Sequence, residues 1–290
     1  MVKLKIPATS ANVGVGFDTL GIALSLYAEV SFTLTKAFAI RGCAPQYATK
    51  DNLIYTSLKK TLCYLKRDIG EVTIDIQSEI PIARGLGSSA SCVVAGVCAA
   101  YLLSGIPLNK EEALHIANEI ETHPDNVAPA LFGGMQASFC INKKVLHVGY
   151  DIHKDYRFVA IIPDYEVSTQ VARAVLPPTL DFSKVVQNTS KLPLLLEALQ
   201  CGNSEHLDRL LEDDIHEPYR KQLLLEYEEV KAICLSCFSV GMYISGSGST
   251  LMAIFKQKID VASLQAQLDA LQYGWRACIV EVDREGVSVC

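Results

Sequence analysis

Apolar and polar residues alternate at the start of the chain, where Val2, Leu4 and Ile6 are separated by lysines. This period of two predicts a β-strand, and we expect Pro7 to end it. Similar patterns predict further strands along the whole chain. They cover residues 22–34, 72–76, 134–141, 157–162, 242–245, 250–255 and 275–282.

Helical spacing of apolar residues appears between these strands. Asp51 and Asn52 are typical helix-start residues, and Leu53, Leu58 and Leu62 follow them at helical spacing. Two more helices are predicted, one directly after the glycine-rich stretch 85–91 and one over residues 110–121. We expect Pro124 to close the second of these, because proline disfavours helical backbone in the residue before it.

Helices and strands are mixed without a steady β-α-β alternation, which favours an α+β fold over a doubly wound sheet. The strands at 134–141 and 157–162 lie on either side of residue 155, after which helical patterns dominate. We therefore expect two domains, an N-terminal one over residues 1–155 and a C-terminal one over residues 156–290.

Composition and charge narrow the class of protein. Half of the 290 residues are apolar and the formal net charge is −6, with no stripe of lysine or arginine, so we expect no nucleic-acid partner. The longest apolar run, residues 92–103, is shorter than the roughly 18 residues of a membrane span, and the N-terminus lacks a signal-peptide pattern. We expect a cytoplasmic chain with no membrane association and with its ten scattered cysteines reduced.

The stretch Gly85-Leu86-Gly87-Ser88-Ser89-Ala90 carries the strongest chemical signal. It could be a simple helix start, or a dinucleotide-binding turn of the G-x-G-x-x-A type. A dinucleotide site also needs an acidic residue about 20 positions later, and none occurs between Glu79 and Glu111. A third interpretation is a phosphate-binding nest whose backbone N–H groups and following helix face an anion.

Three motifs in this order resemble those of the GHMP small-molecule kinases. They are PATSANVGVGFD at residues 7–18, GLGSSA at 85–90 and GMYISGSGST at 241–250. Three further segments are similar to the homoserine kinase family within that group: HPDNVAPA at 123–130, STxxAR at 168–173 and EPYR at 217–220. The third motif is expected to approach the phosphates or the first motif closely.

This resemblance implies a fold and an activity. The expected fold is the two-domain GHMP kinase fold, with an N-terminal half like the second domain of ribosomal protein S5, a ferredoxin-like C-terminal half and ATP at their junction. The expected reaction is transfer of the ATP γ-phosphate to the side-chain hydroxyl of L-homoserine, giving O-phospho-L-homoserine in threonine biosynthesis. A homodimer is also expected from the family.

The resemblance also implies a nucleotide site and a metal site. Ser89 and Glu121 are expected to bind Mg²⁺, with Glu119 as an alternative to Glu121. The expected ATP-binding residues are Asn52, Pro81, Arg84, Gly85, Leu86, Gly87, Ser88, Ser89, Ala90 and Ser91. Asn52 fits a helix cap equally well.

The substrate site implied by the resemblance suits an amino acid, which presents one carboxylate and one ammonium group. Arg173 and Arg220 are expected to form a guanidinium fork for the carboxylate. Asn12, Asp18 and Arg173 are the expected catalytic residues. The expected substrate-binding residues are Asn12, Asp18, His123, Asn126, Thr169, Arg173 and Arg220. We expect Asp18 to bind the ammonium group and not to act as a base, because phosphoryl transfer needs little prior deprotonation.

Two alternatives remain at this stage. One is a related kinase acting on a mevalonate-type alcohol, which would need no partner for an ammonium group. The other is a non-catalytic ATP or metabolite sensor on the same fold, although the presence of both Ser89 and Glu121 speaks against it.

Overall fold

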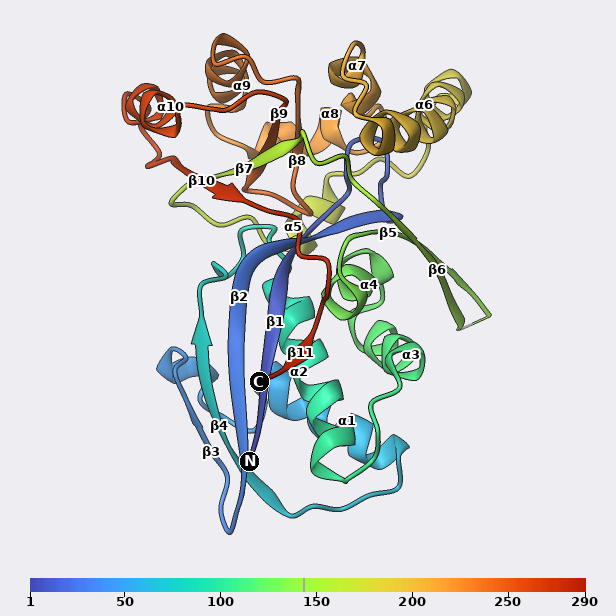
Figure 1. Cartoon of the computed structure of the whole chain (residues 1–290), viewed down its shortest axis with the longest axis vertical. Helices are drawn as coiled ribbons and strands as arrows, with labels where there is room; N and C mark the ends of the chain where they lie inside the picture. The colour runs from blue at the N-terminus through green and yellow to red at the C-terminus, as the bar shows by residue number, and fades with distance from the viewer. Residues whose placement is uncertain (143) are drawn as a thin grey trace.

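The computed structural model describes residues 1–142 and 144–290, and it contains two sheets joined through a shared core (Figure 1). The first sheet has the strand order β11-β1-β2-β4-β3, and β5 and β6 extend from β2. Its strands are β1 (Val2–Ala11), β2 (Leu20–Thr35), β3 (Ala39–Arg41), β4 (Glu71–Ser78), β5 (Met135–Ile141), β6 (Lys144–Tyr150) and β11 (Ser288–Val289). Only β3 and β4 pair in parallel; the other described pairs of this sheet are antiparallel.

Helices gather beside this first sheet, as Figure 1 shows. They are α1 (Leu53–Tyr64), α2 (Ser88–Leu103), α3 (Lys110–Glu121) and α4 (Pro124–Phe132). Helix α2 is apolar around most of its circumference and packs against β1, α1, α3 and α4. A helix that is apolar on all sides belongs in a core. Its burial therefore gives its N-terminal end, at Ser88, a fixed position.

The second sheet has the order β10-β7-β9-β8 and is antiparallel throughout. Its strands are β7 (Arg157–Ile162), β8 (Gly241–Ile244), β9 (Leu251–Phe255) and β10 (Arg276–Val280). The helices of this half are α5 (Thr169–Ala174), α6 (Phe182–Cys201), α7 (Leu207–Leu211), α8 (Glu217–Arg220), α9 (Tyr227–Ser236) and α10 (Val261–Leu268), and short 3₁₀ turns cover Pro45–Tyr47 and Lys221–Leu223. Among the described residues, no helix combines the length and apolar character needed to cross a membrane.

One buried cluster connects the two halves. Leu20 and Leu24 of β2 pack in the same cluster as Phe158 of β7, Tyr243 of β8 and Ile254 of β9. We propose residue 155, in the connection between β6 and β7, as the boundary between residues 1–155 and 156–290. Strand β11 then returns from the second part to pair with β1.

The α+β fold predicted from the sequence is confirmed, and most predicted strands and helices are present within a few residues. Two proline predictions were wrong. Strand β1 continues through Pro7 to Ala11, because a register shift between Pro7 and Ala8 absorbs the missing N–H donor. Pro124 begins helix α4 and does not end α3, because a helix tolerates proline in its first turn. Helix α4 and strand β6 were not predicted.

Candidate active site

The three sequence motifs meet through direct hydrogen bonds. The N–H of Gly246 donates to the carbonyl of Ala11 at 2.9 Å, and the hydroxyl of Ser245 donates to the carbonyl of Gly85 at 2.7 Å. Gly85 has φ +72°, and a Cβ at this position would lie 2.1 Å from the Ser245 carbonyl oxygen. Only glycine fits this crossing without strain. The third motif therefore packs against both other motifs, in agreement with one of its two expected roles.

The glycine turn leads directly into the buried helix α2. Gly87 has φ +69°, and a Cβ there would lie 1.9 Å from the Oγ1 of Thr9 in β1. Leu86 and Ala90 are buried and anchor the turn, and the hydroxyl of Ser91 donates to the carbonyl of Ser88 at 2.9 Å. The first turn of a helix presents N–H groups without intrahelical partners and the positive end of the helix dipole. This geometry suits an anion such as phosphate.

Ser89 and Glu121 are brought together from different helices. The Ser89 hydroxyl, in the first turn of α2, donates to Oε1 of Glu121, the last residue of α3. Burial raises the pKa of Glu121. Glu119 is exposed and lines a separate groove with His115 and Lys144. Of the two candidate carboxylates, Glu121 is thus the one beside the glycine turn.

A hydroxyl and a carboxylate are hard oxygen donors of the kind that Mg²⁺ prefers. The described residues, 1–142 and 144–290, contain no group of three or more His, Cys, Asp or Glu side chains that could hold a metal ion. Two protein oxygens suit Mg²⁺, which usually keeps phosphate oxygens and waters as its other ligands. The residues present therefore fit this ion.

Asp18 and Arg173 form a bidentate ion pair between the two halves of the chain. Arg173 Nη2 lies 2.8 Å from Asp18 Oδ1, and Nη1 lies 3.2 Å from Oδ2. The buried Asn12 side chain accepts from the Asp18 N–H at 2.9 Å and donates to the Gly246 carbonyl at 2.7 Å. Asn12 and Asp18 both have positive φ, 58° and 51°. These contacts hold the loop after β1 in one shape and orient the Asp18 carboxylate.

Arg220 lies beneath this pair and is 1% exposed. Its Nη1 donates to the Gly246 carbonyl at 2.9 Å, and its Nε donates to the Ala172 carbonyl at 3.1 Å. Burial, followed by the nearby Arg173 charge, lowers the pKa of Arg220 to about 10. Arg220 is still charged at neutral pH, so the site holds two guanidinium groups and one carboxylate.

Of the remaining predicted substrate residues, His123 lies near Asp18, and Asn126 and Thr169 contact the first and third motifs. His123 Nδ1 is 3.9 Å from Asp18 Oδ2, and burial lowers the pKa of His123. Asn126 accepts from the Thr9 hydroxyl at 2.7 Å. Thr169 Oγ1 lies 3.5 Å from the Ser247 hydroxyl. Helix α4, which begins directly after His123, thereby connects the cluster to β1.

Of the residues predicted for ATP, Arg84 and Asn52 hydrogen-bond to other parts of the chain, and Pro81 lines a cavity. The Arg84 guanidinium donates to the carbonyls of Pro163 and Asp164 at 3.0 and 2.9 Å, so it ties the glycine turn to the end of β7. Pro81 lines the same cavity as Arg84, next to Trp275. Asn52 caps helix α1: its side chain accepts from the Ile54 N–H at 2.9 Å and donates to the Tyr47 carbonyl at 2.9 Å.

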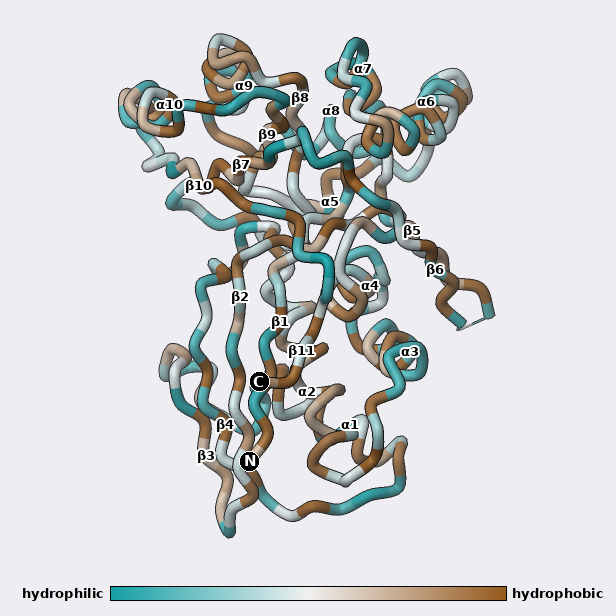
Figure 2. Tube along the Cα trace, viewed as in Figure 1, coloured by the Kyte–Doolittle hydropathy of each residue, from teal (hydrophilic) through white to brown (hydrophobic). Residues whose placement is uncertain are grey.

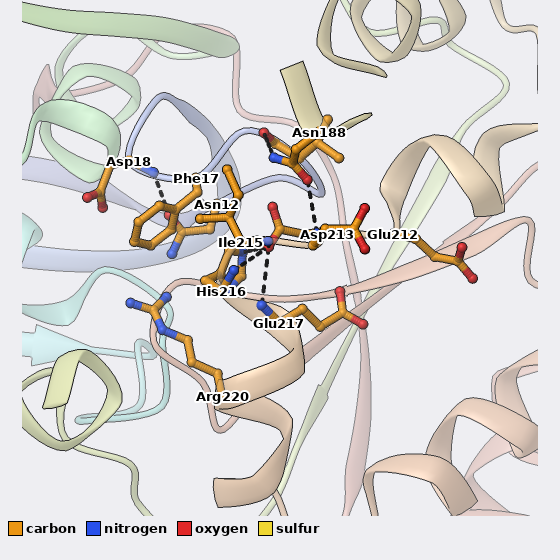
Figure 3. Close-up of polar contacts among 12 residues, drawn as sticks. Asn12, Phe17, Asp18, Asn188, Glu212, Asp213, Ile215, His216, Glu217 and Arg220 are labelled. Carbon is orange, nitrogen blue, oxygen red and sulfur yellow. Dashed lines mark hydrogen bonds and ion pairs between the residues drawn. The ribbon is translucent and has the colours of Figure 1, made fainter. Parts of the chain in front are cut away.

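Sequence reasoning missed several buried polar residues at the site. Asp125 is 3% exposed, and burial, with the charge of Asp18, raises its pKa to about 7. Asp213 and His216 form a buried pair next to Phe17 and Arg220 (Figure 3). The position of Asp125 inside the HPDN segment was an available signal, whereas no local pattern distinguishes Asp213 or His216.

Family models match two parts of the chain. The model described as "GHMP kinases N terminal domain" matches residues 52–134, and the model described as "GHMP kinases C terminal" matches residues 195–273. The first range contains the glycine turn and Glu121, and the second contains the third motif.

Relatives of known identity match the whole chain. A homoserine kinase of Clostridium botulinum is 37% identical over 292 residues, covering 100% of this chain and 98% of the relative. One of Clostridium acetobutylicum is 37% identical over 295 residues and covers 100% of both chains. The crystal structure of homoserine kinase from Cytophaga hutchinsonii has a TM-score of 0.87 with 28% identity, over 100% of this chain and 97% of that one.

Proposed function

Because this chain belongs to the homoserine kinase family of the GHMP kinases, we propose that it transfers the γ-phosphoryl group of ATP to the side-chain hydroxyl of L-homoserine. The product would be O-phospho-L-homoserine, in threonine biosynthesis. The observation that carries this proposal is the charge set of one carboxylate and two guanidinium groups beside the glycine turn. A zwitterionic amino acid needs both signs of charge, whereas a mevalonate-type alcohol needs only the cations.

The nucleotide side of the site is supported by the glycine turn and the start of α2. Backbone N–H groups at residues 85–91 would contact the phosphates, and the helix dipole would favour their charge. Ser89 and Glu121 would hold Mg²⁺, which when bound neutralises charge on the transferred phosphate. We assign Glu121 and not Glu119 this role because only Glu121 bonds Ser89 in the described structure.

The charged side chains at the site also suggest how the acceptor would be bound. Arg173 and Arg220 would bind the homoserine carboxylate, and Asp18 would bind the ammonium group. Asn12, Asp18 and Arg173 are the proposed catalytic residues, since they would hold the acceptor in line with the γ-phosphate. Orientation of this kind supplies much of the catalysis in phosphoryl transfer, and no strong base is required.

The test is ADP production from ATP in the presence of Mg²⁺. L-homoserine, D-homoserine, L-threonine, L-serine and mevalonate are offered separately. We expect turnover with L-homoserine well above the others. Turnover with mevalonate alone would keep the kinase activity and refute the proposed substrate, while ATP binding without ADP production would indicate a sensor.

The ribbon formed by β5 and β6 supports a second proposal, that the enzyme is a homodimer. Phe139 pairs with Leu146 across the two strands, and Val148 lies on the same face. These three residues are 64%, 51% and 58% exposed. Gln136 and Ser138, on the opposite face, are buried. Figure 2 shows the hydrophobic colouring along this ribbon where it projects from the body of the molecule.

The polarity of this ribbon is inverted, because a strand with one solvated face normally presents its polar side chains to water. An exposed apolar face of this kind marks an interaction site. Among the described strands β6 pairs only with β5, so its outer edge is open as well. A second copy related by a two-fold axis would cover each apolar face with an identical one. Glu111 and Glu112 on the adjacent α3 disfavour an anionic membrane as the partner.

Light scattering after size-exclusion chromatography tests the homodimer. We expect the wild-type mass to be about twice the 31.6 kDa of one chain. Phe139→Glu should reduce it to one chain, whereas Phe182→Glu, at an 83% exposed position on α6, should not. A single-chain mass for the wild type, or an unchanged mass for Phe139→Glu, would exclude this interface.

We also propose that the enzyme works in the cytoplasm. Its ten cysteines are all free within the described residues, as a reducing compartment would keep them.

A further inference from the structure

Phe17 occupies a central place among the charged groups of the site (Figure 3). The Cζ atom of Arg220 lies 5.1 Å from the centroid of its ring, and that of Arg173 lies 5.8 Å away. The imidazole of His216 is stacked on the same ring, with 4.9 Å between centroids and 29° between planes. One aromatic side chain thus contacts both guanidinium groups of the proposed carboxylate site.

His216 is held in place from behind by a buried carboxylate. Oδ1 of Asp213 accepts from the backbone N–H groups of Ile215, His216 and Glu217, at 2.8, 2.5 and 3.2 Å. His216 and Arg220 stand at the two ends of helix α8, so this carboxylate cap fixes the start of the element that carries Arg220. The stacked imidazole and the guanidinium are therefore positioned by the same turn of chain.

The stacked imidazole is uncharged at neutral pH. Burial is the largest influence on His216 and lowers its pKa to about 4, against the opposing effect of Asp213. A neutral ring packs against Phe17 without adding a third positive charge next to Arg173 and Arg220. The neutral imidazole can therefore pack against Phe17 without repelling the two arginines near the same ring.

The two guanidinium groups need compensation, because like charges repel in a buried site. Arg173 has the Asp18 carboxylate as its partner. Arg220 makes no salt bridge with any described carboxylate, and its hydrogen bonds go to the backbone carbonyls of Ala172 and Gly246. The electron-rich face of an aromatic ring attracts a guanidinium group, most strongly where water is excluded. Phe17 supplies that attraction to both arginines.

We propose that Phe17, supported by the stacked His216, is a positioning residue that holds Arg173 and Arg220 together for the carboxylate of the acceptor. This inference rests on the proposed function. By holding the two arginines, the aromatic side chain would favour acceptors that carry a carboxylate. Phe17 acts through the arginines and has no part in the transfer step itself.

The experiment compares Phe17→Leu with Phe17→Tyr in steady-state ADP production. Leucine removes the ring and keeps an apolar side chain, whereas tyrosine keeps the ring. We expect Phe17→Leu to raise the KM for homoserine about 5- to 30-fold, with kcat and the KM for ATP changed less than about twofold. Phe17→Tyr should keep the wild-type KM. Phe17→Met serves as a second non-aromatic variant if Phe17→Leu does not fold, and Phe182→Leu, at an 83% exposed position, is the control.

A purely structural role would move all three kinetic parameters together in Phe17→Leu, and this result would overturn the proposal. An unchanged homoserine KM in both non-aromatic variants, or an equal rise in Phe17→Tyr, would overturn it as well. Failure of the proposed function is distinguished from failure of this inference, because it would already change the substrate preference of the wild-type enzyme. If the wild type uses another carboxylate-bearing alcohol, the same comparison is made with the KM for that alcohol. A wild-type acceptor without a carboxylate, or no turnover with any alcohol, refutes both proposals.

Discussion

Gly85 offers the sharpest test of how the motifs are joined, because the chain contains a matched control. Gly85 and Gly70 have nearly the same φ, +72° and +75°. A Cβ at Gly85 would lie 2.1 Å from the Ser245 carbonyl oxygen and 2.8 Å from that of Gly248. A Cβ at Gly70 would have no neighbour within 4 Å. Alanine at Gly70 therefore measures the backbone strain alone.

The expected magnitudes follow from these contacts. A left-handed alanine costs about 1–2 kcal/mol at either position. At Gly85 the Ser245 carbonyl oxygen must also move by more than 1 Å, from 2.1 Å to the 3.4 Å of ordinary contact. That carbonyl accepts the Gly248 N–H at 2.9 Å, and the Ser245 hydroxyl donates to the Gly85 carbonyl at 2.7 Å. Weakening these two hydrogen bonds adds about 1–3 kcal/mol.

Thermal unfolding and ADP production measure the difference. An extra cost of about 2 kcal/mol corresponds, for a chain of 290 residues, to a Tm about 3 °C lower for Gly85→Ala than for Gly70→Ala. We also expect Gly70→Ala to keep wild-type turnover and Gly85→Ala to lose most of it, because the phosphate-facing turn is displaced. Equal Tm values and equal turnover for the two variants would refute the close crossing of the second and third motifs.

Three further predictions concern individual charges. Glu121→Gln should lower kcat at least about 100-fold, because it weakens Mg²⁺ binding. The matched Glu119→Gln variant should keep the wild-type kcat. Equal effects of the two substitutions in a steady-state assay would exclude Glu121 as the Mg²⁺ ligand. Asp18→Asn should raise the KM for homoserine about 10- to 100-fold, with a smaller fall in kcat; a large fall in kcat at constant KM would identify a general base. Burial raises the pKa of Asp125 to about 7, above its ordinary 3.8, so the folded state loses stability as pH rises from about 4 through 7. The Tm of Asp125→Asn relative to wild type should therefore increase over this range, and a constant difference would contradict the burial effect.

Local features of the sequence predicted the fold well where neighbours in the chain determine the outcome. The limits of α3 matched residues 110–121, and Asn52 caps α1 as its position before a run of apolar residues indicated. The resemblance to GHMP kinases, carried by short motifs, is confirmed by the family models and the relatives. Such motifs are readable because their backbone shapes demand glycine or serine at fixed spacing.

Features that depend on distant partners were not predictable in this way. Pro7 stays in a strand because β2 shifts its register there, and nothing near Pro7 in the sequence shows this. Asp213 and His216 become a supporting layer only because the fold places Phe17, about 200 positions earlier in the chain, against them. Strand β6 does not show the usual alternation, because Leu146 and Val148 are exposed apolar residues and only Val145 is buried in the core.

The contacts between motifs connect the proposed phosphate site to the proposed acceptor site. The Gly246 carbonyl accepts from both Asn12 and Arg220, so one peptide group of the third motif holds two of the residues proposed to bind the acceptor. The neighbouring Ser245 hydroxyl donates to the carbonyl of Gly85, 160 positions away, in the turn that we propose to contact the phosphates. Adjacent residues of the third motif therefore touch both sites. A change there should alter the KM values for ATP and homoserine together, whereas a change at Phe17 should alter only the latter.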